Sequence, residues 1–280
     1  MTSPLTDEPL EIREDVLDSA ACRLQKAATS QVPCAPVRDL IGPDDLAAAY
    51  AVQARVNHTR LLSGARVVGR KIGLTSPAVQ AQLGVDQPDF GVLFEDMDHS
   101  TPRGDGAVVP LELLMQPKVE AEIAFVLDAD LAEGDLDDNQ VRAAVASVRP
   151  ALEIVDSRIA GWDITFGDTV ADNGSSGLFV LGDASRTLEE FEPKNAQMTM
   201  TRGNEIVSSG SGDVCLGDPL HALAWLARTA RDVGDPLLAG QVVLSGALGP
   251  MVAVTAPSHF AAQITGLGSV SVTFSRKDSA

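Results

Sequence analysis

The feature that most limits how this chain can fold is a series of short apolar runs that starts near residue 65, with Gly, Pro or Asp between the runs. They include VVGRKIGLT, GVLFEDM, KVEAEIAFVL, ALEIVDSRI, GLFVLG and GSVSVTFS. Their length, β-branched residues and flanking turn residues are typical of strands. Helical patterns interrupt them near residues 139–148 and 219–233. Strands joined by turns, with a few helices, predict an α+β protein rather than a doubly wound parallel sheet.

The sequence before this series has a different texture and predicts an N-terminal helical segment, residues 1–64, ahead of a second domain, residues 65–280. Apolar residues spaced as on one helix face predict an amphipathic helix from Leu10 to about Ser30. A second helix is expected from Pro43 to Gly64, with two aspartates in its first turn. The Pro-rich stretch QVPCAPVRDLIGP between them is expected to be an extended connector.

The charge of the chain excludes several functions. Lys and Arg number 21 and Asp and Glu 39, giving a formal net charge of −18. Such acidity argues against nucleic-acid binding and against docking on anionic membranes. No apolar run approaches the roughly 20 residues of a membrane span, and the acidic N-terminal sequence does not resemble a secretory signal. The three cysteines have no disulfide or zinc spacing. We therefore expect a soluble cytoplasmic protein.

Two glutamates occupy alternate positions in the apolar run Pro117–Leu127. Because side chains in a strand alternate between faces, Glu120 and Glu122 point to the same side. Two neighbouring carboxylates repel each other and are costly to bury, and a hard cation such as Mg²⁺, Mn²⁺ or Ca²⁺ is the usual remedy. A half-exposed strand with a solvated acidic face fits the same spacing. Spacing alone leaves both interpretations open.

Two further charged residues lie in apolar, strand-like runs. Glu153 could join Glu120 and Glu122 as a third metal ligand, leaving open positions for water and substrate. Lys71, between glycines, is a candidate for proton transfer or anion binding, although a lysine whose ammonium group reaches solvent fits the pattern too. Asp156, near Glu153, is expected either on the opposite side of its strand or paired with Arg158.

Two polar turns are less specific. Asp89 lies in the turn-like sequence QPDFG, where aspartate is usually structural. The stretch 168–177 is expected to be a polar loop of small residues, and such loops bind substrates but are more often simple turns. The chain has no GxSxG elbow and no GxxxxGK[ST] phosphate loop, and its four histidines are scattered. These absences argue against hydrolase and nucleotide-binding chemistry of those types.

Three long motifs now combine: KIGLTSPAVQAQLGVDQPDFGVLFEDM, VEAEIAFVL and ALEIVDSRIAGWDITFGDTVADNGSSG. In this order they resemble the 2-keto-4-pentenoate hydratases, also called 2-hydroxypenta-2,4-dienoate hydratases, of the fumarylacetoacetate hydrolase superfamily. The resemblance extends from about Asp45 to about Phe274. It implies that residues 65–280 are the catalytic domain, a mixed β-roll or barrel with flanking helices. It also implies a divalent metal cofactor, Mg²⁺ or Mn²⁺.

The same resemblance assigns roles to individual residues. As metal ligands it implies Glu120, Glu122 and Glu153. As catalytic residues that give and take protons, in either order, it implies Lys71 and Asp89. As candidates for substrate binding it implies Asn173, Ser175 and Ser176. Gly174 stands where alanine is expected in many relatives, which leaves the individual assignments within this loop open.

The implied activity is that of a hydro-lyase, which hydrates a 2-hydroxy-2,4-dienoate to a 4-hydroxy-2-oxo acid in the breakdown of aromatic or steroid rings. The expected partners are this small-molecule substrate and further copies of the chain in a homo-oligomer, with no nucleic acid and no membrane. Related 4-oxalocrotonate decarboxylases share the carboxylate set but are expected to lack the aspartate of PDFG, so Asp89 favours the hydratase.

Two other functions remain as alternatives. An acylpyruvate-type C–C hydrolase would usually need a His/Glu pair, and no histidine lies within these motifs. A catalytically inactive homologue that serves as an assembly subunit is the other possibility, against which the intact carboxylates and Lys71 argue.

Overall fold

The computed structural model describes residues 14–76, 80, 85–101 and 106–276. The helices are α1 (Glu14–Ser30), α2 (Arg38–Ile41), α3 (Leu46–Leu62), α5 (Asp138–Ala143), α6 (Phe166–Ala171) and α7 (Pro219–Asp232). The strands of the first half are β1 (Val67–Gly73), β2 (Asp89–Phe94), β3 (Ala107–Pro110), β4 (Lys118–Leu127) and β5 (Val145–Val155). Those of the second half are β6 (Ser176–Leu181), β7 (Gln197–Arg202), β8 (Glu205–Ser211), β9 (Val242–Leu244), β10 (Val252–Ala253), β11 (Ser258–Ile264) and β12 (Gly268–Ser275).

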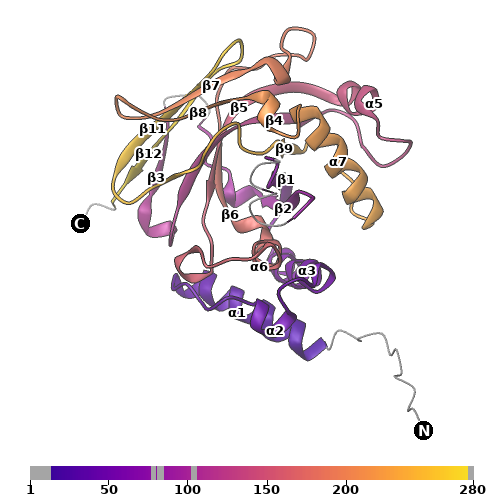
Figure 1. The fold of residues 1–280 in the computed structure, drawn as a ribbon, viewed down its shortest axis with the longest axis vertical. Coiled ribbons are helices and arrows are strands. Elements are labelled where there is room, and N and C mark those ends of the chain that lie inside the picture. Colours follow the sequence, from indigo (N-terminus) through magenta and orange to yellow (C-terminus); the bar gives the residue numbers. More distant parts are fainter. Residues whose placement is uncertain (1–13, 77–79, 81–84, 102–105, 277–280) are drawn as a thin grey trace.

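Within the described ranges, seven strands form one mixed sheet in the order β2-β1-β9-β4-β5-β6, with β10 paired to β4. Strands β1 and β9 run parallel, and the other pairs are antiparallel. The long strands β4 and β5 are at the centre of the molecule, and Figure 1 shows them curving between β7, β8, β11 and β12 on one side and α7 on the other. The mixed, curled sheet with flanking helices confirms the predicted fold class.

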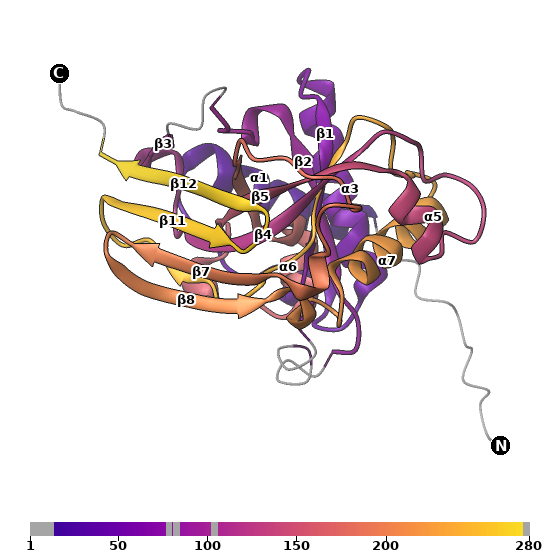
Figure 2. The same cartoon turned by 90° about the horizontal axis from the view of Figure 1, so that it is seen from above.

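A second sheet of five described strands, β3-β12-β11-β7-β8, covers part of the first. Apolar side chains of both sheets meet in the main core, among them Phe125, Leu152, Phe260 and Phe274. Helix α7 packs against the same core through its buried leucine and alanine residues. In Figure 2 the second sheet lies on one side of β4 and β5, and α5 and α7 lie on the other. The two long strands are therefore shielded from solvent.

Helices α1, α2 and α3 lie together beneath the large sheet (Figure 1) and pack against α6 through a separate apolar cluster that includes Leu24, Val52 and Val170. Asp45 caps α3, because its carboxylate accepts a hydrogen bond of 2.9 Å from the Ala48 amide. Since α3 also contacts α6, packing does not by itself set a domain boundary at residue 64, which stays a prediction. No helix in the described ranges combines the length and the apolarity needed to cross a membrane.

Three predictions of local structure are wrong in part. The helix expected at residues 139–148 ends at Ala143, and residues 145–148 belong to β5, since β-branched Val145 and Val148 pair with β4. The connector before Pro43 contains the short helix α2. The loop expected at residues 168–177 begins inside α6, whose capping box joins Thr165 and Asp168. Residues 10–13 of the first predicted helix lie outside the described residues.

Candidate active site and metal centre

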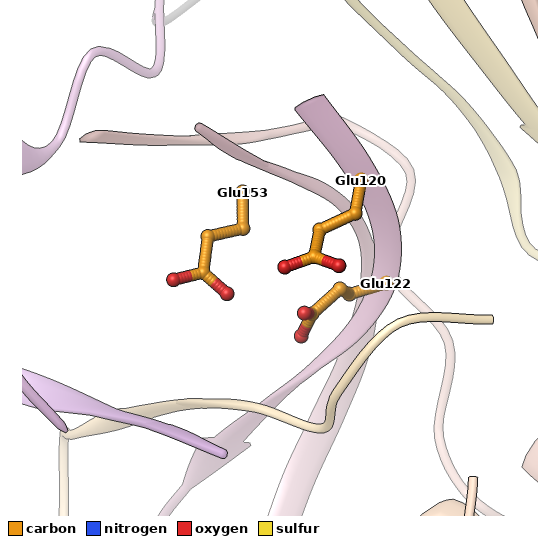
Figure 3. Close-up of side chains that lie close together, drawn as sticks. All are labelled: Glu120, Glu122 and Glu153. Atoms are coloured by element: carbon orange, nitrogen blue, oxygen red, sulfur yellow. The ribbon is translucent and has the colours of Figure 1, made fainter. Parts of the chain in front are cut away.

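The register of β4 and β5 brings three glutamates together. Glu120 lies directly opposite Glu153, and Glu122 follows two positions along β4 on the same face. All three side chains are buried, and one carboxylate oxygen of each lies within 4.8 Å of the others. Figure 3 shows the three carboxylate groups gathered close together, with Glu120 and Glu122 on the same strand. The sequence-predicted ligand set is therefore gathered at one point of the fold.

The sheet order also brings Lys71 to this face. Lys71 of β1 and Ala124 of β4 both pair with Leu244 of β9, so Lys71 points to the same side of the sheet as Glu120 and Glu122. Its Nζ atom lies 3.3 Å from Glu153 Oε1 and donates a hydrogen bond of 2.9 Å to the carbonyl oxygen of Gly174. Lys71 is buried, so it is not a lysine that reaches solvent.

Asp89 begins β2, opposite Gly73 of β1, and shares this face with Lys71. Its side chain is buried, and its Oδ1 atom has no hydrogen-bond partner among the described residues. Glycine at position 73 permits this arrangement, because a Cβ atom there would lie 2.1 Å from Asp89 Oδ1 and displace the carboxylate. The missing side chain leaves room for the carboxylate.

Burial is the main cause of unusual pKa values at the site. Burial, with repulsion from Glu153, raises the pKa of Glu120 to about 7. It also raises the pKa values of Glu122, Glu153 and Asp89, although Lys71 opposes each rise. For Lys71 burial opposes the charge, but Glu153 and the other carboxylates outweigh it and hold the pKa above its ordinary value. Four carboxyl groups thus surround Lys71, with Lys118 acting on Glu120 from the cavity wall, and they need protons or a further cation.

The donor set fits a hard divalent cation. Among the described residues, Glu122 Oε1 and both carboxylate oxygens of Glu153 are buried without a hydrogen bond, and Glu153 Oε1 has only its ion pair with Lys71. Glu122 Oε2 accepts a hydrogen bond of 2.8 Å from the Gly246 amide. Buried carboxylate oxygens without partners are costly, and oxygen-only ligand sets suit Mg²⁺, Mn²⁺ or Ca²⁺. Glu120, Glu122 and Glu153 are therefore the residues of the described chain that would hold such an ion.

A cavity of about 570 Å³ opens beside these groups. The large sheet contributes Lys71, Asp89 and Glu120 to its wall. Much of the remaining wall is apolar and includes Trp162, Ile164, Phe166, Val214, Leu248 and Met251. The cavity thus combines charged groups with an apolar surface, as small-molecule sites commonly do.

A left-handed turn holds the main-chain partner of Lys71. Asn173, Gly174 and Ser175 have φ angles of 57°, 62° and 52°, a conformation that is unfavourable for the two residues with side chains. The Asn173 side chain secures the turn: its Oδ1 accepts a hydrogen bond of 2.8 Å from the Val92 amide, and its Nδ2 donates one of 2.9 Å to the Val92 carbonyl. Because β2 is an edge strand, this side chain completes its hydrogen bonding.

The three candidates for substrate binding occupy different places. Ser175 lines the cavity, and its Oγ lies 3.2 Å from Thr169 Oγ1. Ser176 Oγ donates a hydrogen bond of 2.8 Å to the carbonyl oxygen of Asn173. Asn173 and Ser176 are not among the described residues that line the cavity. The structure thus brings the Ser175 side chain to the cavity. The Asn173 and Ser176 side chains instead form hydrogen bonds with main-chain atoms around the turn.

Arg158 also stabilises this turn, through contacts with the residues on either side of it. Its guanidinium group pairs with the buried carboxylate of Asp172 at 2.5 Å and donates a hydrogen bond of 2.6 Å to the Ser176 carbonyl. One of the two alternatives for Asp156, a pairing of its carboxylate with Arg158, is wrong, because that carboxylate accepts hydrogen bonds from the amides of Met115 and Gln116. Arg158 instead donates a hydrogen bond of 2.6 Å to the main-chain carbonyl oxygen of Asp156.

Sequence reasoning missed two residues at the site. Lys118 lines the cavity and lies two positions before Glu120 on β4, so the period of the strand could have identified it. The Gly246 amide, which binds Glu122, follows β9 in the chain and reaches the site only through the sheet order. No local sequence signal marks that contact.

Known proteins resemble this chain over nearly all of its length. Residues 66–275 match the family described as Fumarylacetoacetate (FAA) hydrolase C-terminal. The chain is 52% identical over 261 residues to a 2-keto-4-pentenoate hydratase of Burkholderia vietnamiensis (strain G4 / LMG 22486), covering 93% of this chain and 98% of that protein. It is 40% identical over 260 residues to a 2-hydroxyhexa-2,4-dienoate hydratase of Comamonas testosteroni, covering 92% and 97%.

A solved structure gives the same result for the fold. The 4-oxalocrotonate decarboxylase from Pseudomonas putida G7, complexed with magnesium and adipate, superposes with a TM-score of 0.88 and 33% sequence identity, covering 94% of this chain and 98% of that one. The curled mixed sheet thus has a structural counterpart of similar overall fold. The chain belongs to the fumarylacetoacetate hydrolase family, which confirms the resemblance seen in its sequence motifs.

The raised pKa of Glu120 predicts how pH affects the metal-free protein. A carboxyl group with a higher pKa in the folded than in the unfolded state stabilises the fold while protonated, and this stabilisation is lost as pH rises through about 7. Glu120→Gln, which imitates the protonated form, should therefore gain thermal stability relative to the unsubstituted protein as pH rises. Melting curves recorded with a chelator across this range test this, and a difference that does not change with pH would contradict it.

The affinity for a divalent ion should rise with pH, whereas the stability of the metal-free protein falls. The ligands must lose their protons, so affinity should rise with pH up to about 7, by as much as about tenfold per pH unit for each proton released. Calorimetry with Mg²⁺ in buffers of different ionisation enthalpy measures both the affinity and the protons released. An affinity independent of pH, or no proton release, would contradict the interpretation of the three glutamates as ligands.

The Asn173 contacts predict a loss of stability. Asn173→Ala would leave the buried amide and carbonyl of Val92 without partners, so the free energy of unfolding should fall by about 2–4 kcal/mol. Chemical denaturation measures this fall. Asn204→Ala, in the exposed turn between β7 and β8, is the matched control and should remain close to the unsubstituted protein.

Proposed function

We propose that this enzyme hydrates 2-hydroxypenta-2,4-dienoate, or a close homologue, to the corresponding 4-hydroxy-2-oxo acid in the breakdown of aromatic compounds. The observation that carries the proposal is the gathering of three buried carboxylates, Lys71 and Asp89 on one sheet face, beside a cavity, in a chain 52% identical to a 2-keto-4-pentenoate hydratase. The 40% identity to a 2-hydroxyhexa-2,4-dienoate hydratase supports the same reaction type.

Glu120, Glu122 and Glu153 would hold the divalent ion, for which we propose Mg²⁺ or Mn²⁺. When bound, the ion supplies a Lewis acid that stabilises negative charge on the 2-oxygen of the substrate. The three side chains suit this task because a short ladder between two central strands fixes their spacing. The magnesium complex of the related decarboxylase supports the proposal of a divalent metal.

The reaction requires three additions to the dienoate. A proton adds to C5 as the enol becomes a ketone, the oxygen of a water molecule then adds to C4 as that water loses a proton, and a proton adds to C3. Asp89 suits this work, because its Oδ1 atom has no hydrogen bond to the described residues and burial raises its pKa above the ordinary value. Asp89 is therefore our candidate for the group that moves protons.

Lys71 would act mainly as a fixed cation. Its ion pair with Glu153 and its hydrogen bond to the Gly174 carbonyl hold the ammonium group on the same face as Asp89, where its charge lowers the pKa of that carboxyl group. The Ser175 hydroxyl on the cavity wall could orient water or the substrate. For Asn173 and Ser176 we propose that any effect on substrate binding passes through the turn they support.

Decarboxylation of a 4-oxalocrotonate-type acid is the second candidate, supported by the TM-score of 0.88 to a decarboxylase. The sequence identity to that protein is 33%, against 52% to the hydratase, so hydration is better supported. The third alternative, acylpyruvate hydrolysis with a His/Glu pair, has less support, because no histidine lines the cavity among the described residues. A cytoplasmic location and a homo-oligomeric assembly stay predictions, which cell fractionation and light scattering would test.

Removal of one ligand should abolish metal-dependent hydration. We expect Glu122→Gln to lower kcat/KM by about a hundredfold or more and to weaken Mg²⁺ binding, because one oxygen ligand and one charge are lost. Loss of dienol absorbance and calorimetry measure the two effects. Glu205→Gln, at an exposed position in β8, is the control. The metal proposal would be wrong if Glu122→Gln kept full activity and a chelator did not reduce that activity.

Replacement of Asp89 should separate catalysis from metal binding. Asp89→Asn keeps the shape of the side chain but cannot exchange the proton, so kcat should fall by about a hundredfold or more while Mg²⁺ affinity stays within about threefold. Asp128→Asn, at an exposed position after β4, is the matched control. A separate measurement on the unsubstituted enzyme should follow release of CO₂ from 4-oxalocrotonate. Release of CO₂ without loss of the dienoate in the hydration assay would favour the decarboxylase.

A further inference from the structure

A second lysine lines the cavity. Lys118 is the first residue of β4 and, by the period of the strand, shares its face with Glu120. Its Nζ atom lies 3.9 Å from the centroid of the Trp162 ring. The indole Nε1 of Trp162 donates a hydrogen bond of 2.9 Å to the carbonyl oxygen of Gln116, so the ring is itself held in place. The ammonium group thus has a defined position on the cavity wall.

The two lysines of the cavity differ in how their charges are balanced. Lys71 has an ion pair with Glu153 and a hydrogen bond to a carbonyl oxygen. Among the described residues the Lys118 side chain has no carboxylate within 4.0 Å and no hydrogen bond, and its ammonium group lies over the face of Trp162. An aromatic face attracts a cation but does not neutralise it. Lys118 therefore presents to the cavity an ammonium group without an ion-pair partner. Burial lowers the pKa of Lys118, and the charge of Glu120 opposes this change from a longer distance.

The position of Lys118 fits a ligand that also reaches the metal centre. Two residues along a strand span about 7 Å, so Lys118 and the cavity-lining Glu120 are separated by about the length of a small 2-oxo acid. An anionic substrate must enter a protein of net charge −18 whose cavity wall also carries Asp89 and Glu120. A local cation at the wall would offset this repulsion.

We infer that Lys118 is a carboxylate-binding residue for the substrate, and that Trp162 holds its ammonium group in position. The inference rests on the proposed function for the identity of the substrate. The carboxylate has two possible sources: the C1 carboxylate that every 2-hydroxydienoate carries, or a second carboxylate at the far end of a longer dienoate. Both have the same chemistry, and a charge-assisted hydrogen bond to ammonium suits either one.

The test compares Lys118→Met, which keeps the apolar stem but removes the charge, with Lys118→Arg, which keeps the charge and can stack on Trp162. For 2-hydroxypenta-2,4-dienoate, Lys118→Met should raise KM by about tenfold or more with kcat changed less than about threefold, and Lys118→Arg should restore KM. Trp162→Leu should raise KM in the same direction but less. Lys194→Met, at an exposed position, is the matched control.

A second substrate distinguishes the two carboxylates. If Lys118→Met raises KM both for the pentadienoate and for a dienoate with a second, terminal carboxylate, the C1 carboxylate is the ligand. If the loss is confined to the dicarboxylate, the terminal group is the ligand. An unchanged KM for both substrates would overturn the inference, as would a loss in Lys118→Met that Lys118→Arg does not restore although both variants melt and bind Mg²⁺ like the unsubstituted protein.

A binding experiment keeps this inference separate from the proposed reaction. Calorimetry with 2-oxopentanoate, an unreactive acid with one carboxylate, in the presence of Mg²⁺ reports on Lys118 even if the unsubstituted enzyme hydrates no dienoate. Adipate, with a carboxylate at each end, is the second probe. Lys118→Met should weaken binding of at least one of them by about tenfold, and unchanged affinity for both would again overturn the inference.

Discussion

The structure of this protein depends on a pair of like charges placed opposite each other in its buried centre. Glu120 and Glu153 are direct partners in the β4–β5 ladder, a position in which their Cβ atoms are about 5 Å apart and like charges destabilise a sheet. Glu122 adds a third carboxylate to the same face. A sheet with this pattern is stable only if cations or protons balance the charge, and the order of the strands supplies Lys71 for that purpose.

Around this pair, segments of main chain pack so closely that a side chain at certain glycine positions would prevent the contact. A Cβ atom on Gly91 would lie 2.2 Å from the Asn173 carbonyl oxygen, so glycine lets the left-handed turn pack onto β2. The turn then directs the Gly174 carbonyl toward Lys71, and Asn173 supplies the hydrogen bonds that hold it there. Unfavourable backbone angles at this site are thus offset by side-chain hydrogen bonds, as is common where a site needs a fixed geometry.

The sequence alone was sufficient to predict features that follow from local period and chemistry. Strand alternation placed Glu120 and Glu122 on one face, and an apolar run containing Glu153 suggested the third ligand. The sequence alone did not predict features that depend on contacts between distant segments. Residues 145–148 form a strand because β4 lies beside them, and the Asn173 side chain binds the edge of β2. The position of Asp89 at the site came from family resemblance, since a turn aspartate carries no such signal.

The net charge of −18 shows how a strongly acidic chain can handle an anionic substrate. Much of the acidity is peripheral, as in the exposed aspartates between residues 128 and 138. Around the cavity, the three glutamates and Asp89 face Lys71 and Lys118, so that full ionisation would leave two negative charges. One divalent cation would balance them. An incoming carboxylate would then meet individual cations rather than a negative field, which links substrate binding to occupation of the metal site.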